Sequence, residues 1–372
     1  MQRAFPEIGF NLPVITLSGS AFQRGFQHGA GFSSQIANAL RRMRESYPYV
    51  SYEHARIVAI KSWKALQAVA PMIAEEICGI AAGSNADLID LYCHIGFEFF
   101  EADAPTGCSA VAIAGKDGAI IGQNWDCHPD MIEDLALFQH IGEDGEGVTV
   151  VATVGSLGWV GLNRSGLALL STDVMLDTAK HGFPSQVARR MMLRQTSVSA
   201  ARACLETLPA LAGRTYLLGD RSGSVAVIEV SPSTGICQLA ETTRHFHTNH
   251  ALASQTICVE DVARLQAVYP SSRLRLSTLE RAGANAVSVT DLKHVLANRE
   301  NAPDAVSKTV SSCEPTMTAF SIIFDCGRHD LHLCSGTPSA EGYQRLHWPQ
   351  TRSSIAQALT LPPVPQAIGV DI

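Results

Sequence analysis

The chain has 372 residues, of which 46% are apolar and 17% are charged, and its formal net charge is −7. This acidic balance excludes the basic surface with which nucleic-acid-binding proteins hold phosphates. No uncharged apolar run reaches the ~18 residues that a membrane-spanning helix needs, so neither nucleic acid nor membrane is an expected partner. Residues 1–14 show no signal-peptide pattern, and the ten cysteines form no C-x-x-C pair. Both features predict a reduced, cytoplasmic protein.

The N-terminal part carries apolar residues at helical spacing and predicts helices over residues 21–39, 55–69, 72–81 and 87–100. After Pro105 the apolar period changes to two, and strands at 108–114 and 119–124 form a hairpin. The elements predicted further along are strands at 147–154, 158–162 and 167–171, hairpins at 216–230 and 319–334, and helices at 184–194, 197–207, 259–268, 273–281 and 291–296. This order indicates helices packed on antiparallel sheets. No glycine-rich nucleotide motif follows a strand, which argues against a Rossmann or P-loop fold.

Cys108 is the first candidate for a catalytic residue, because it begins a predicted strand directly after Gly107. A thiol in this position can attack the carbonyl of the preceding residue, and hydrolysis of the resulting thioester frees a new N-terminus. The freed α-amine has a reference pKa of ~7.7–8.0 and can act as the base for its own thiol. The alternative is a buried strand cysteine without chemistry, which is the commoner role of any one cysteine.

Asp126 and Asn249 are candidates for the groups that assist this thiol. The hairpin brings Asp126 to the same end as Cys108, where a carboxylate can hydrogen-bond an α-ammonium group; a turn-forming aspartate is the alternative. Asn249 can aim its side-chain N–H at a developing oxyanion. His245 and His247 share one face of a predicted strand, so a metal-dependent hydrolase is a rival hypothesis, although the pattern supplies no third ligand. Histidines bonded only to backbone are the remaining alternative.

Nine short motifs occur in a fixed order through nearly the whole chain. The most specific two are Gly107-Cys108 and the segment Gly122-Gln123-Asn124-Trp125-Asp126. The others lie at residues 25–29, 75–83, 161–167, 216–220, 228–229, 247–250 and 271–273. With these motifs the sequence resembles the acyl-coenzyme A:6-aminopenicillanic acid acyltransferase family, self-processing N-terminal-nucleophile hydrolases of the peptidase C45 type.

The resemblance implies an α+β fold, a four-layer αββα sandwich of the N-terminal-nucleophile hydrolase type with a helical N-terminal segment. It implies cleavage between Gly107 and Cys108 into a small chain, 1–107, and a catalytic core, 108–372, which remain associated as partners. It also implies that Cys108 is the nucleophile, that Asp126 supports its α-amine and that Asn249 stabilises the oxyanion. Arg273, in Ser271-Ser272-Arg273, resembles an arginine near the nucleophile of related choloylglycine-type hydrolases; a plain helix N-cap is the alternative.

Two positions depart from the family's pattern. The family's cleavage site reads Asp-Gly-Cys-Thr-Thr, but here Ala110 lacks the last hydroxyl, and Glu314 stands where many relatives carry a basic residue. The penicillin substrate is therefore not carried over. We expect hydrolysis or transfer of a small N-acyl (amide) substrate through a Cys108 acyl-enzyme, without cofactor or metal. No adenine-nucleotide motif for coenzyme A is visible, but acyl-coenzyme A-dependent N-acyl transfer at the same site stays an alternative. Whether the chain forms a homo-oligomer stays open.

Overall fold

A computed structural model describes residues 11–100, 107–143 and 147–348 of the chain. The expectation about a signal peptide therefore falls largely outside the described residues. These residues form two β-sheets, one of eight strands and one of six. In spatial order, the larger sheet contains β1 (Val14–Gly19), β4 (Leu135–Gly142), β5 (Gly147–Thr153), β6 (Val160–Asn163), β7 (Ala168–Thr178), β8 (Ala212–Gly219), β9 (Val225–Ser231) and β10 (Gly235–Gln238). The smaller sheet contains β11 (Arg244–His247), β2 (Gly107–Ile113), β3 (Ile120–Cys127), β12 (Met317–Asp325), β13 (Asp330–Ser335) and β14 (Gln344–His347).

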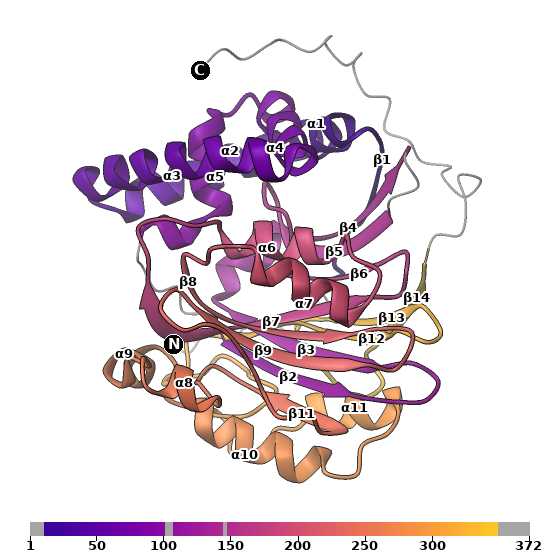
Figure 1. The fold of residues 1–372 in the computed structure, drawn as a ribbon. Coiled ribbons are helices and arrows are strands. Elements are labelled where there is room, and N and C mark those ends of the chain that lie inside the picture. Colours follow the sequence, from indigo (N-terminus) through magenta and orange to yellow (C-terminus); the bar gives the residue numbers. More distant parts are fainter. Residues whose placement is uncertain (1–10, 101–106, 144–146, 349–372) are drawn as a thin grey trace, which may run out of the picture.

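Helices cover the outer faces of both sheets (Figure 1). On the larger sheet lie α1 (Ala21–Gly31), α2 (Ser33–Ser46), α3 (Tyr49–Val69), α4 (Pro71–Ser84), α5 (Leu88–Ile95), the 3-10 helix η1 (Phe97–Phe100), α6 (Ser185–Met192) and α7 (Val198–Glu206). The C-terminal half adds α8 (Ser254–Ile257), α9 (Val262–Val268), α10 (Ser272–Gly283) and α11 (Val289–Leu296), and a short 3-10 helix, η2 (Pro129–Asp134), follows β3. In Figure 1, α1–α5 lie above the larger sheet, and α10 and α11 lie below the smaller one. The predicted αββα sandwich is confirmed.

The alternation of side chains along β2 shows how the layers are joined. Ala110 and Ala112 point into the core between the two sheets, which also contains Leu170 of β7. Val111 and Ile113 point the other way, into the core beneath α10 and α11. Both faces of β2 are buried, so the strand is apolar from Ala110 to Ile113 instead of alternating with polar residues. The first residues of β2 are held in place, because both faces of the strand pack against other parts of the protein.

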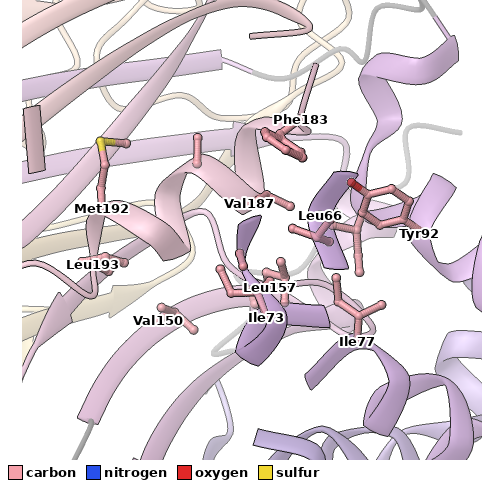
Figure 2. Close-up of a cluster of buried hydrophobic side chains, with 14 of the residues drawn as sticks. Leu66, Ile73, Ile77, Tyr92, Val150, Leu157, Phe183, Val187, Met192 and Leu193 are labelled. Carbon is pink, nitrogen blue, oxygen red and sulfur yellow. The ribbon is translucent and has the colours of Figure 1, made fainter. Parts of the chain in front are cut away.

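A third core fixes the N-terminal helices to the larger sheet. Figure 2 shows Ile73 and Ile77 of α4 in one cluster with Val150 of β5 and Val187 of α6. Complete burial of a side chain of this size stabilises the fold by about 1.5–3 kcal/mol. The N-terminal segment is therefore part of the same compact unit as the sheets, and not a separate domain.

Helices α1 and α4 touch through glycines. A Cβ atom on Gly25 of α1 would lie 2.0 Å from the Glu76 carbonyl oxygen, and one on Gly79 of α4 would lie 2.2 Å from the Phe22 carbonyl oxygen. Both distances are far inside van der Waals contact, so the two backbones approach this closely only because side chains are missing. These glycines belong to two of the motifs that carried the family resemblance, and their role is helix packing.

Strands β4, β10 and β14 were not predicted from the sequence, and further departures lie near the N-terminus. Strand β1 was not expected, and it makes the N-terminal segment more than a helical unit, because it pairs in parallel with β4. It is a short edge strand in which Leu17 is the one fully buried side chain, too brief to display a period. The single helix predicted over 21–39 is divided into α1 and α2 at Phe32. Among the described residues, no helix is both long and apolar enough to cross a membrane.

Candidate active site

Cys108 is held in place by the hairpin of β2 and β3. It is the second residue of β2, lies opposite Trp125 of β3 and is only 3% exposed. Its Sγ accepts a hydrogen bond from Nε2 of Gln123 at 3.3 Å, and the same nitrogen donates to the Ser171 carbonyl oxygen at 2.9 Å. The thiol is thus fixed between the two sheets by a side chain that bonds to both of them.

The backbone around Cys108 is bonded to the loop and helix that follow β11. The Cys108 N–H donates to Oδ1 of Asn249 at 3.0 Å, and Nδ2 of Asn249 donates to the Asp173 carbonyl oxygen at 3.1 Å. Arg275 of α10 donates to the Cys108 carbonyl oxygen, to Ser109 Oγ at 3.0 Å and to Asn249 Oδ1 at 2.7 Å. The structure therefore turns the acceptor oxygen of Asn249, and not its N–H group, toward Cys108.

Arg273 does not join this cluster. Its side chain is 66% exposed and forms an ion pair with Glu260 at 3.2 Å. The buried arginine on the same helix is Arg275, two residues later and 1% exposed. The sequence contains a signal that favours Arg275. At helical spacing, position 275 lies on the same face as Leu276 and Leu279, and an apolar face of this kind is expected to be buried. We therefore take the arginine of this site to be Arg275.

Asp126 faces Gly107 across the hairpin and is completely buried. Its Oδ1 accepts a hydrogen bond from Thr318 at 2.7 Å, whereas its Oδ2 has no partner among the described residues. A Cβ atom on residue 107 would lie 2.9 Å from that Oδ2, so a residue larger than glycine would clash with Asp126. Burial raises the pKa of Asp126, and the nearby positive charges of Lys308 and Arg275 oppose this effect.

The electrostatic surroundings of the thiol keep it protonated. Burial raises the pKa of Cys108, and the carboxylates of Asp173 and Asp126 act in the same direction. The guanidinium groups of Arg275 and Arg189 act in the opposite direction and do not overcome burial. A thiol in this state needs a base before it can attack a carbonyl, since the thiolate is the nucleophile.

The histidines of the metal hypothesis are engaged in other contacts. His247 is completely buried, with Nε2 bonded to Glu229 at 2.9 Å and Nδ1 to Thr172 at 3.0 Å. Glu229 also accepts from the N–H of Leu252 at 2.7 Å, so the pair fixes the loop that follows Asn249. Within the part of the chain that the structure describes, no three His, Cys, Asp or Glu side chains are arranged to hold a metal ion. The described residues thus offer His245 and His247 no third ligand.

The two departures from the family's pattern both fit their surroundings. Ala110 lies inside the smaller sheet, opposite His247 of β11 and Gln123 of β3. Glu314 forms an ion pair with Lys308 at 2.6 Å, and both side chains are nearly buried. Glu314 therefore has a positively charged partner, although its carboxylate still acts to raise the pKa of Asp126.

A cavity of about 220 Å³ opens beside Cys108. Its wall combines aromatic residues with polar and charged ones: Phe97, Trp125, Met131, Trp159, Ser171, Asp173 and Arg189, with Tyr47, Arg42, His94 and Asp134 among the rest. Trp125 stacks on Trp159 with ring centroids 5.8 Å apart. The cavity has the volume of a small ligand, and its apolar wall suits an acyl chain.

A thiol on the wall of such a cavity, surrounded by hydrogen-bond donors in a two-sheet sandwich, is suited to acyl transfer. A sequence profile of the family described as "Acyl-coenzyme A:6-aminopenicillanic acid acyl-transferase" matches residues 113–340, and the chain belongs to this family. The matched region includes Asp126, Asn249 and Arg275 and begins after Cys108. Membership makes the chain an enzyme of acyl transfer or acyl-amide hydrolysis.

One curated relative is the 40 kDa form of acyl-coenzyme A:6-aminopenicillanic-acid-acyltransferase from Emericella nidulans. It is 26% identical over 254 residues, which cover 64% of this chain and 69% of that protein. Among solved structures, a single-residue variant of conjugated bile acid hydrolase from Clostridium perfringens is 10% identical, with a TM-score of 0.42 over 66% of this chain and 98% of the other. Penicillin V acylase from Agrobacterium tumefaciens is 14% identical, with a TM-score of 0.40 over 62% and 84% of the two chains.

Four residues of the site were not predicted from the sequence as site residues: Arg275, Thr318, Arg189 and Gln123, the last of which was only part of a family motif. Thr318 reaches Asp126 across the smaller sheet, since β12 pairs with β3 there. Arg189 comes from α6, on the far side of the larger sheet from α10. Neither Thr318 nor Arg189 has a local pattern that could reveal it, because each is brought to the site by pairing and packing between distant segments.

Proposed function

We propose that the chain is a self-processing amidohydrolase or acyltransferase whose nucleophile is Cys108, set free by cleavage after Gly107. The observation that supports it most is the position of Cys108. Its thiol lies on an apolar cavity, and its backbone nitrogen is already held by Asn249 at 3.0 Å. That nitrogen becomes the α-amine after cleavage, so base and nucleophile would belong to one fixed residue.

In the processing step, Sγ of Cys108 attacks the Gly107 carbonyl carbon. The C–N bond breaks, the Cys108 nitrogen takes up the thiol proton, and a thioester remains. Water then hydrolyses the thioester, giving a Gly107 carboxylate and a free thiol. Gly107 favours this shift because glycine tolerates the strained backbone that the attack requires, and a larger residue here would also clash with Asp126.

In the catalytic cycle, the neutral α-amine takes the thiol proton while sulfur attacks the carbonyl of an N-acyl substrate. The tetrahedral intermediate expels its amine, which receives the proton, and an acyl-thioester stays on Cys108. Water resolves this acyl-enzyme in a hydrolase, and a second amine resolves it in an acyltransferase. Arg275 fixes the Cys108 carbonyl and Asn249, and Gln123 donates its hydrogen bond to the sulfur.

Acyl-coenzyme A-dependent N-acyl transfer at the same site is the second candidate, and the name of the Emericella relative, an acyl-coenzyme A:6-aminopenicillanic-acid-acyltransferase, is the observation that favours it. Two donor assays separate the candidates. An N-acyl amide that releases its amine in water indicates hydrolysis. An acyl-coenzyme A that is consumed only when an acceptor amine is present indicates transfer.

The test of the proposal combines denaturing mass spectrometry with these assays. We expect two species whose masses add up to that of the intact chain plus one water, in a preparation that turns over substrate. Cys108→Ala should give one intact, inactive species, and Cys108→Ser should be processed slowly. Cys127→Ala is the matched control, because Cys127 is a buried cysteine of the neighbouring strand. An intact chain with full activity, or an active Cys108→Ala variant, would overturn the proposal.

A further inference from the structure

Arg189 is a buried cation without a carboxylate partner among the described residues. Its side chain is 2% exposed, and Nη2 donates to the Ser171 hydroxyl at 2.9 Å. Its guanidinium carbon lies 5.4 Å from the ring centroid of Trp159. Within the described ranges, Nε and Nη1 have no hydrogen-bond partner. Since a guanidinium carries five N–H donors, most of its bonding capacity is unused.

The neighbouring buried arginines are satisfied differently. Arg190, the next residue of α6, binds both carboxylate oxygens of Glu76, at 2.9 and 2.6 Å. Arg214 of β8 binds Glu98 at 3.0 Å and Asp173 at 3.1 Å. Burial of a cation is costly unless an anion compensates it, and these two arginines follow that rule. Arg189 has one neutral hydroxyl instead, whereas Arg275, which likewise pairs with no carboxylate among the described residues, donates to four neutral oxygens.

Arg189 also lines the cavity that Cys108 lines. The indole Nε1 of Trp159, on the same wall, is buried and has no partner among the described residues either, so the unused polar groups here are both donors. The acidic residues on this wall are engaged: Asp173 binds Arg214, and Asp134 binds Arg42. Arg189 therefore brings a positive charge to the wall of this cavity, and the unpartnered N–H donors of Arg189 and Trp159 are buried beside it, whereas both acidic residues of the wall already have a partner.

We propose that Arg189 and Trp159 bind a carboxylate group of the substrate, so that the enzyme acts on N-acyl compounds that carry an acid near the scissile amide. A carboxylate matches the planar fork of a guanidinium with two parallel hydrogen bonds, and the indole N–H supplies a further donor. Binding removes the cost of the unpaired buried cation, which makes the neutral analogue of the same substrate a poor fit. This proposal rests on the proposed function, because it assigns the substrate of the Cys108 site.

The test uses matched pairs of small amides that differ only in one group. The first pair is an N-acylglycine and its glycinamide, with the acid on the amine part. The second pair is a monoamide of a dicarboxylic acid and its methyl ester, with the acid on the acyl part. We expect kcat/KM for the acid of one pair to exceed that for its neutral analogue by about 10- to 100-fold, the usual value of a hydrogen bond to a charged group. The pair that shows the preference identifies the part that carries the acid.

Arg189→Met should abolish the preference, lowering kcat/KM for the acid by at least about 10-fold more than kcat/KM for its neutral analogue. Arg189→Lys should retain part of it, because the charge remains but the fork is lost. Arg202→Met, which removes a surface arginine of α7 paired with Glu206, is the control and should keep the preference. A wild-type enzyme that prefers neither acid, or an Arg189→Met variant that keeps the preference, would overturn the proposal.

A binding measurement separates this proposal from the proposed function. In the Cys108→Ala protein, calorimetric titration should detect the N-acylglycine but not the glycinamide, and adding Arg189→Met should remove the signal. If this binding is seen without any turnover in the wild type, the carboxylate site stands and the catalytic assignment fails. If turnover is seen without any acid preference, the catalytic assignment stands and the carboxylate site fails.

Discussion

Oδ1 of Asn249 lies 3.0 Å from the backbone nitrogen of Cys108, although the two residues are 141 positions apart in the chain. The same oxygen accepts a second hydrogen bond from Arg275 at 2.7 Å. Asn249 thus connects the start of β2 to α10 and to the Asp173 carbonyl of β7. From the sequence, its N–H was expected to face an oxyanion; in the structure its oxygen instead orients the atom that would become the catalytic amine.

We predict that Asn249→Ala lowers kcat by about 10- to 100-fold, the usual cost of losing a hydrogen bond that involves a charged group, because the Cys108 nitrogen and Arg275 both lose their acceptor. Asn249→Asp should be at least as damaging, because a carboxylate oxygen would replace the N–H that faces the Asp173 carbonyl. Asn163→Ala is the matched control: this buried asparagine bonds the Leu193 and Gln195 carbonyls away from the site, so it should lower Tm but not kcat. Equal kcat losses for the two alanine variants would contradict the assignment.

Two arginines on α10 provide a direct comparison of position. Arg275→Met should reduce both processing and turnover by at least about 10²-fold, because it removes the donor to the Cys108 carbonyl and leaves Asn249 half-bonded. Arg273→Met should behave like the wild type in both assays, since it breaks only an exposed ion pair with Glu260. Kinetics and mass spectrometry of the two variants check this. Loss of activity in Arg273→Met alone would restore Arg273 as the functional arginine.

The pH dependence of activity should report the α-amine of Cys108 and its neighbour Asp126. The amine must be neutral to accept the thiol proton, so kcat/KM should rise with pH through the amine's pKa. A nearby carboxylate favours the ammonium form and raises that pKa. Asp126→Asn should therefore move the acidic limb to lower pH and reduce the rate. Superimposable acidic limbs for the two proteins would separate Asp126 from the amine.

Asp126 should also limit stability in the unprocessed chain. Burial raises its pKa in the folded state, so the unfolded state loses the proton first, and stability falls as pH rises from the ordinary carboxyl pKa of ~3.9 through the raised value. In a Cys108→Ala background, Asp126→Asn should raise Tm by about 2 °C at pH 7, and this gain should vanish at pH 3. Thermal unfolding at the two pH values measures it. A gain in Tm that is larger at pH 3 than at pH 7 would mean that folding does not raise the pKa of Asp126.

The contact between α1 and α4 predicts opposite effects for two glycines. Gly79→Ala would bring a methyl group to 2.2 Å from the Phe22 carbonyl oxygen, and the helices would have to separate at a cost of about 1–3 kcal/mol. Gly31→Ala, at the end of α1, meets no atom within 4 Å and should leave stability unchanged or raise it. Urea denaturation distinguishes them. A similar midpoint for both variants would mean that the helices do not depend on this close approach.

The parts of the fold that could be predicted from the sequence are those in which neighbouring residues show the apolar period or the turn residues of the element that they form. The hairpin of β2 and β3 was predicted because both strands and their turn are adjacent, and it places Cys108 and Asp126 at one end, as expected. Arg189 could not be predicted, since α6 reaches Cys108 only through the packing of the larger sheet. The helix predicted over 72–81 continues to Ser84, because Gly83 packs inside α4 against α1, and the left-handed residue that ends the helix is Asn85.

Strand β1 has a consequence for a chain cut between Gly107 and Cys108. Its residues from Val14 to Gly19 pair with Leu137 to Gly142 of β4, so the outermost strand of the larger sheet would belong to the small fragment and its neighbour to the large one. A large fragment produced alone would expose the bare, mostly apolar edge of β4, and such edges recruit strands from other molecules. In a cleaved chain the N-terminal fragment would cover this edge, and we expect the large fragment to need it, or a peptide with the sequence of β1, to remain monodisperse.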